Sequence, residues 1–121
     1  MKYSRVINYR HLREVRTNAK SFNYVLKANI TTDDSLSIQS VIEKAIDWYN
    51  TNNGMHIKYP RYPITDQHVR RIIVNYIRHK LTNYDVLKGR LYRKLGNVSS
   101  VDACNILRDR VNDVIEEKYK I

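Results

Sequence analysis

The sequence predicts an α+β fold that is mainly α, with one or more N-terminal strands and a helix followed by a three-helix C-terminal subdomain. Apolar residues recur with the helical period of 3.6 in four segments, 33–53, 65–80, 83–95 and 100–119. Between residues 22 and 30 they instead alternate with polar or long side chains, the period of a half-buried strand. Three Gly and two Pro leave little room for a linker. We therefore expect residues 1–121 to form a single domain, with a mixed α/β part at 1–64 and a three-helix part at 65–121.

The N-terminal half contains both helical and strand-like patterns. Residues 1–20 fit a helix somewhat better than a strand. The strand predicted next is defined by five alternating positions: Phe22, Tyr24, Leu26, Ala28 and Ile30. In the helix that follows, Asp33, Asp34 or Ser35 can cap the first turn, and Gly54 can end it with a positive φ. Pro60 and Pro63 then predict an extended segment, either an edge strand or an ordered loop.

The C-terminal half reads as three helices joined by short turns. Thr65 or Asp66 is expected to cap the first, and Thr82 or Asn83 to start the second. Cys104 is expected on the inner side of the last helix, where a thiol acts as a small hydrophobic side chain. Because it is the single Cys, no intramolecular disulfide is possible.

Charge is the strongest functional signal. The chain carries a net charge of +10, which is typical of proteins that bind phosphates. The positive charge lies in two blocks, with net +6 in residues 1–30 and net +8 in residues 58–94. We therefore expect basic faces that bind nucleic acid or an acidic protein surface.

The candidate binding residues combine cations with aromatic rings, because cations follow phosphates while rings stack on bases. At 100° per residue, Arg71 and Arg78 share one line of a helix, opposite its Ile stripe, and His68, Asn75 and His79 form a neighbouring line. The alternative is that these are the solvated sides of amphipathic helices. The full candidate set is Lys58, Tyr59, Arg61, Tyr62, Arg71, Arg78, His79, Lys80, Arg90, Arg93 and Lys94.

The tract "IRHKLTNYD", followed by a Leu-rich turn and "ILRDRVNDVIEEKY", resembles the C-terminal part of small uncharacterised proteins from phages and other mobile elements. The resemblance covers residues 69–119 at most. It implies a bacterial or phage setting and no established activity. The positions that match the short motif are Arg78, His79, Thr82, Asn83, Tyr84 and Asp85. Their role, in function or in folding, stays open.

Non-catalytic binding to nucleic acid or a nucleoprotein complex is the function that the sequence favours. The alternative is a phage- or mobile-element-encoded inhibitor or adaptor of a host protein such as a defence nuclease. Catalysis has little support, although folding could bring together Asp66 with His68, or His79 with Asp85. A metal-independent nuclease that uses His with Tyr or Lys stays open. We expect no cofactor and no metal site. DNA, RNA and a homodimer partner all remain open.

The location is also an expectation from sequence. The start of the chain lacks the apolar stretch of a signal peptide, and there is no apolar run of 18 residues. We therefore expect no membrane association, and a cytoplasmic protein in a bacterium or an infected host cell.

Overall fold

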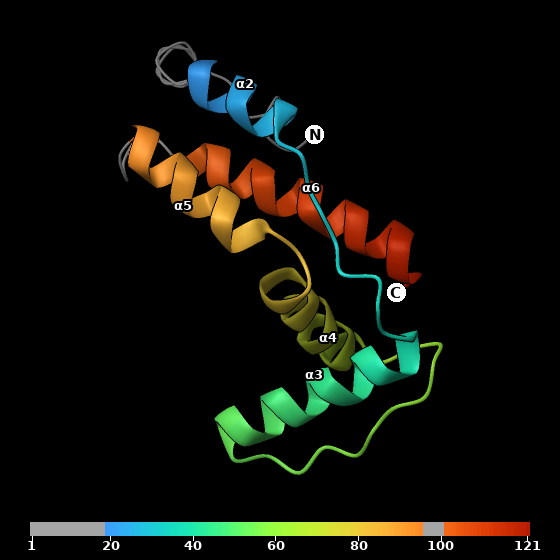
Figure 1. The fold of residues 1–121 in the computed structure, drawn as a ribbon. Coiled ribbons are helices and arrows are strands. Elements are labelled where there is room, and N and C mark those ends of the chain that lie inside the picture. The colour runs from blue at the N-terminus through green and yellow to red at the C-terminus, as the bar shows by residue number, and fades with distance from the viewer. Residues whose placement is uncertain (1–18, 96–100) are drawn as a thin grey trace. The chain divides into compact units, whose positions relative to one another are not determined.

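The computed structural model describes residues 19–95 and 101–121, and this part of the chain is helical (Figure 1). Its elements are α2 (Ala19–Lys27), α3 (Ile38–Asn53), α4 (Gln67–Lys80), α5 (Tyr84–Leu95) and α6 (Val101–Tyr119). No strand occurs in these residues, so the α+β prediction is wrong for them. The pairing of extended backbone is limited there to one bridge between Thr32 and Thr82. The predictions for residues 1–18 lie outside the described residues.

The predicted strand at 22–30 is the clearest correction, because most of it belongs to α2. Burial in this segment does not follow the alternating pattern. Val25 is fully buried, whereas Leu26, which the alternation placed on the inner face, is 60% exposed. A strand is stabilised by pairing with a neighbour, and the described residues offer none. The helix therefore satisfies backbone groups that an isolated strand would leave open.

Contacts divide the chain into two compact units. Of the described residues, unit 1 comprises 19–29, 86–95 and 101–108, and unit 2 comprises 30–85 and 109–121. Unit 1 therefore contains α2, most of α5 and the first part of α6. Unit 2 contains α3, α4 and the last part of α6.

The core of unit 2 is built on the packing of α3 against α4. Its buried side chains are Val41, Ile42, Ala45 and Ile46 of α3 and Ile72, Ile73, Val74 and Ile77 of α4. All of them except Val74 lie on the 3.6-residue stripes that the sequence predicts, so periodicity identifies most of this core.

The ends of both helices have specific caps. The hydroxyl of Ser37 accepts from the N–H of Ser40 at the start of α3, so the expected caps at residues 33–35 are wrong. Asp33 instead accepts from the backbone N–H of Ser35, in a turn before the helix. Gly54 ends α3 as predicted, with φ of 60°, a conformation that favours glycine. Asp66 caps α4 by accepting from two backbone N–H groups.

The segment between α3 and α4 is extended but forms no strand. It is held to α3 by side chains rather than by a sheet. Asn50 makes two hydrogen bonds with the backbone of Ile57, of 3.0 and 3.1 Å, and Gln39 donates to the carbonyl of Pro60. The prediction of an ordered loop is confirmed, and the edge-strand alternative is wrong.

Unit 1 has its own buried side chains. They are Val25 of α2, Leu87 and Leu91 of α5, and Ala103, Cys104 and Leu107 of α6. Cys104 is buried, as expected for a thiol that serves as a small apolar group. None of the helices in the described residues is long and apolar enough to cross a membrane.

Candidate nucleic-acid interface

The eleven candidate residues are divided between the two units. Those of unit 1 lie on α5 and are Arg90, Arg93 and Lys94. Those of unit 2 lie in the loop before α4 or on α4 itself, and are Lys58, Tyr59, Arg61, Tyr62, Arg71, Arg78, His79 and Lys80. The candidates thus form three groups: one on α5, one in the loop before α4 and one on α4. The contacts of each group show which side chains are already used by the fold.

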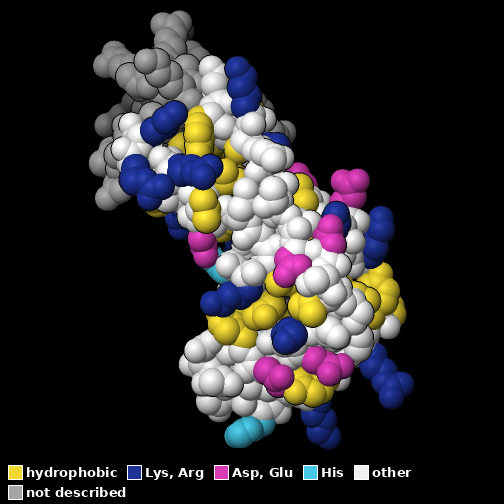
Figure 2. Space-filling model, in the orientation of Figure 1, with side chains coloured by type: hydrophobic (Ala, Val, Ile, Leu, Met, Phe, Trp, Pro, Cys, Tyr) yellow, Lys and Arg dark blue, Asp and Glu magenta, His cyan; other side chains and the backbone are white. Residues whose placement is uncertain are grey.

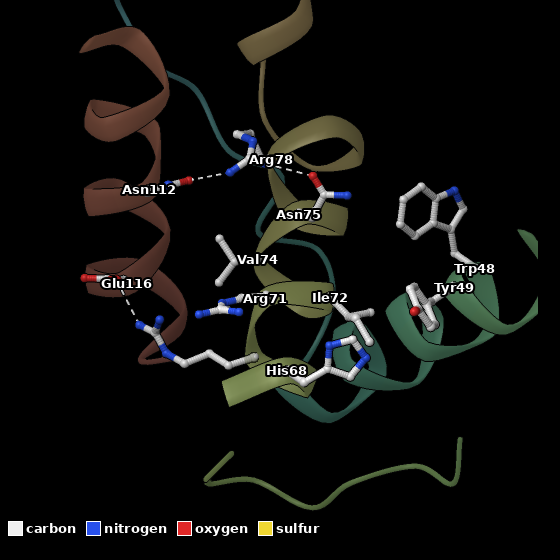
Figure 3. Close-up of a pocket in the computed structure, with 11 residues that line it drawn as sticks. Trp48, Tyr49, His68, Arg71, Ile72, Val74, Asn75, Arg78, Asn112 and Glu116 are labelled. Carbon is white, nitrogen blue, oxygen red and sulfur yellow. Dashed lines mark hydrogen bonds and ion pairs between the residues drawn. The ribbon is translucent and has the colours of Figure 1, made fainter. Parts of the chain in front are cut away.

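Arg78 of α4 is half-buried and holds two elements together (Figure 3). Its guanidinium donates to the side-chain oxygen of Asn112 on α6 and to that of Asn75 on α4, each at 2.8 Å. It also lies 5.7 Å from the centroid of the Tyr84 ring. A guanidinium committed to two amide oxygens and a ring face supports the fold of unit 2, and is poorly placed to follow a phosphate backbone.

The motif that follows Arg78 forms the corner between α4 and α5. The hydroxyl of Thr82 donates to the carbonyl of Arg78 and accepts from the N–H of Tyr84. The Asn83 side chain accepts from the N–H of Thr31 at 2.9 Å, and its backbone N–H donates to the Thr31 carbonyl. These interactions give the motif residues a role in folding, because they hold the turn after α4 against residues 31–32, at the only paired extended backbone in the described residues.

His79 and Asp85 meet at the same corner, with 2.8 Å between Nδ1 and Oδ1. The other suggested pair does not form a dyad, since Asp66 accepts from the backbone N–H groups of His68 and Val69. Within the described residues, no Ser, Thr or Cys side chain is hydrogen-bonded to His79, and no three His, Cys, Asp or Glu side chains are grouped as metal ligands would be. The corner therefore presents an acid and a base without an aligned nucleophile.

The loop group offers two half-exposed rings. Tyr59 is 51% exposed and Tyr62 is 42% exposed. Both are anchored at the hydroxyl end, Tyr59 to the Asp47 carboxylate and Tyr62 to the Lys120 carbonyl. The hydrogen bond to Asp47 raises the pKa of Tyr59. The two hydrogen bonds hold both rings against other residues of unit 2 and leave part of each ring face exposed.

Arg71 is the exposed guanidinium of α4. It lines a cleft of about 460 Å³ whose residues all belong to unit 2 (Figure 3). No hydrogen bond or ion pair to its side chain occurs in the part of the chain that the structure describes. Arg70 beside it is committed, at 2.8 Å to Glu116 and 2.7 Å to the carbonyl of Ile121.

The α5 group lies on an exposed surface that also includes the end of α2. Lys94 lies 5.4 Å from the centroid of the Tyr24 ring. Arg90 lines a hollow of about 430 Å³ together with Tyr24 and Lys27 of α2. We call this set of side chains the α5 surface: Tyr24, Lys27, Arg90, Arg93 and Lys94.

Sequence reasoning missed the α2 members of this surface. On the expected strand, Tyr24 and Lys27 would face opposite sides. Three residues apart on a helix, they lie on one side. Only a helical assignment of residues 19–27 would have brought them together.

The net charge of the described residues belongs entirely to unit 1. Unit 2 contains ten Lys or Arg and ten Asp or Glu, so its formal charges cancel. The described residues of unit 1 contain seven Lys or Arg and one acid, Asp102, which gives net +6. Figure 2 shows Lys and Arg side chains gathered over α5, whereas over α3 and α4 they are interspersed with Asp and Glu.

Comparison of the chain with protein-family models, with curated proteins and with solved structures gives no match. The α5 surface is therefore described by its own chemistry alone: cations without paired acids in the described residues, with an aromatic ring among them.

Proposed function

We propose that the chain is a non-catalytic nucleic-acid-binding protein that contacts phosphates through the α5 surface. The observation that carries this proposal is the division of charge. Phosphate contacts come from cations that are not already neutralised by neighbouring carboxylates. Unit 2 cancels its own charge, while the described part of unit 1 retains net +6.

Two features of the α5 surface support a nucleic-acid partner in particular. Lys27, Arg90, Arg93 and Lys94 are exposed, and within the described residues none of them forms an ion pair. Tyr24 adds an aromatic ring between cations, the combination that binds single-stranded nucleic acids by stacking and phosphate contact. The hollow beside Arg90 leaves room for a backbone group to approach.

Unit 2 supports the interface less well. Its Arg78 is held by Asn75 and Asn112, and Arg70 by Glu116. The cations in its loop and on α4 are accompanied by enough acids elsewhere in the unit to cancel their charge. The proposed interface therefore contains the candidate residues of α5, Arg90, Arg93 and Lys94, and not those of unit 2.

The test is fluorescence anisotropy with labelled single- and double-stranded DNA and RNA at several salt concentrations. We expect binding whose log affinity falls linearly with log salt. The triple variant Arg90→Gln, Arg93→Gln, Lys94→Gln should bind more weakly and with a shallower slope. On double-stranded DNA the slope should become shallower by roughly 0.9 for each phosphate that the variant no longer neutralises.

The matched control removes three exposed lysines from unit 2, as Lys44→Gln, Lys58→Gln, Lys80→Gln. It changes the net charge by the same amount, so it should leave affinity and slope close to those of the unaltered protein. Equal weakening in the two triple variants would mean that only total charge matters, and would contradict a defined surface. Absence of binding at low salt would overturn the proposal altogether.

A further inference from the structure

The cleft that contains Arg71 has chemistry that nucleic-acid binding by the α5 surface does not use. Its floor is one face of α4, because His68, Arg71 and Asn75 follow one another at spacings of three and four residues. Trp48 and Tyr49 of α3 stand on one side, and Asn112 and Glu116 of α6 on the other (Figure 3). All of these residues belong to unit 2.

The polar groups of the cleft are mainly donors. Three guanidinium groups line it against one carboxylate, that of Glu116. Glu116 is occupied by Arg70, at 2.8 Å. Arg71 is exposed and, in the described residues, has no hydrogen bond or ion pair of its own. A guanidinium in this state presents a planar fork of N–H groups that matches a carboxylate or a phosphate.

Asn75 adds a second donor. Its side-chain oxygen accepts from Arg78 at 2.8 Å, which turns the NH₂ end of the amide away from Arg78 and toward the Trp48 side (Figure 3). The amide is therefore fixed as a donor at the middle of the cleft.

The aromatic side of the cleft is pre-organised. Trp48 meets the ring of Tyr76 edge to face, with 5.8 Å between centroids. Tyr49 meets the ring of His68 in the same way, at 6.0 Å. These ring pairs hold the aromatic side chains in place at the end of the cleft away from α6. A ligand that spans the cleft would meet donors at one end and rings at the other.

We infer that this cleft binds a small organic oxyanion, in which a phosphate or carboxylate group on Arg71 is joined to a planar body beside Trp48 and Tyr49. A volume of about 460 Å³ is within the range of small-molecule sites. The site is independent of the α5 surface, since it belongs to the other unit.

The molecule contains its own reporter for this site, because Trp48 is the only Trp in the chain. The experiment is a titration of the full chain, followed by Trp48 emission and by calorimetry. Four probes separate the chemistry: adenosine monophosphate, adenosine, inorganic phosphate and benzoate. Adenosine monophosphate and benzoate each combine a ring with an anion, and we expect at least one of them to bind more tightly than adenosine and inorganic phosphate. Comparing the monophosphate with benzoate distinguishes phosphate from carboxylate.

Arg71→Gln should weaken binding of the preferred probe by about tenfold or more, the effect of removing a charge-assisted bidentate interaction. Lys44→Gln, which removes an exposed cation of α3 outside the cleft, should leave the affinity unchanged. The α5 triple variant should also bind the probe normally, which separates this inference from the proposed function. Equal affinity in Arg71→Gln, or no binding of either ring-bearing anion to a folded protein, would overturn it.

Discussion

Arg71 and Arg78 show how two residues that are equivalent in sequence acquire different roles. Both lie on the outer line of α4, seven residues apart, and helical periodicity cannot distinguish them. The difference comes from Asn112, which lies 34 residues beyond Arg78 and is brought to it by α6. Arg71 has no such partner in the described residues. Sequence could therefore identify the helix face but not which of its cations was committed to the fold.

The first prediction follows from this contrast. Arg78→Ala removes two hydrogen bonds from a charged donor and the interaction with the Tyr84 ring. We expect the free energy of unfolding to fall by about 1–3 kcal/mol. Urea unfolding followed by circular dichroism measures the change.

Arg71→Ala is the control on the same face of α4. It should change the free energy of unfolding by less than about 0.5 kcal/mol, as expected for an exposed side chain away from structural contacts. If the two variants were equally stable, the structural role given to Arg78 would be wrong.

At the scale of elements, sequence was most informative where a helix has a continuous apolar stripe. The helices expected around residues 33–53, 65–80, 83–95 and 100–119 are present, with ends shifted by up to a few residues. The shift at the start of α3 has a physical cause. Asp33 is used in a turn with Ser35, so Ser37 is the residue left to cap the helix. Competition between such local side-chain interactions is hard to rank from sequence.

The strand prediction for most of α2 was wrong for a related reason. In a segment this short, alternation and a partial helical stripe involve overlapping positions, and only tertiary packing decides between them.

The turn before α3 is tied to the end of α6, and this connection predicts acid sensitivity. Asp34 accepts from Lys118 at 2.8 Å and from the hydroxyl of Thr32. These hydrogen bonds lower the pKa of Asp34 below its ordinary value of 3.8. A lowered pKa means that the carboxylate stabilises the folded chain above that ordinary value, and that this contribution disappears as the pH falls through the folded value.

We therefore expect Asp34→Asn to be less stable than the unaltered protein at neutral pH, with the difference shrinking as the pH is taken below 3.8. Urea unfolding of both proteins at neutral pH and at a pH below 3.8 measures this difference in stability. Asp113→Asn is the matched control, since Asp113 is an exposed carboxylate of α6 without a hydrogen bond or ion pair in the described residues. A stability difference for Asp34→Asn that persisted in acid would argue against the linkage.

At the scale of the whole molecule, the distribution of charge could not be predicted from blocks of sequence. Residues 58–94 formed one basic block along the chain, yet the fold divides them between units at residue 85. The acids that balance the first part of the block come from distant segments, including four carboxylates at 109–121. Linear charge blocks therefore do not give the charge of each unit, because neutralisation depends on which segments the fold brings into one unit.

The burial of Cys104 has a consequence for measuring how the molecule opens. It is the only thiol in the chain, it belongs to unit 1 and it is 7% exposed, while the only indole, Trp48, belongs to unit 2. The rate of labelling by a thiol reagent therefore reports the opening of one unit, and indole emission reports the other, without any substitution. Coincident denaturation curves from the two readouts would mean that the units unfold as one cooperative system. Thiol labelling at denaturant concentrations that leave the indole signal unchanged would mean that unit 1 opens by itself. If unit 1 binds nucleic acid as proposed, adding nucleic acid should then slow the labelling.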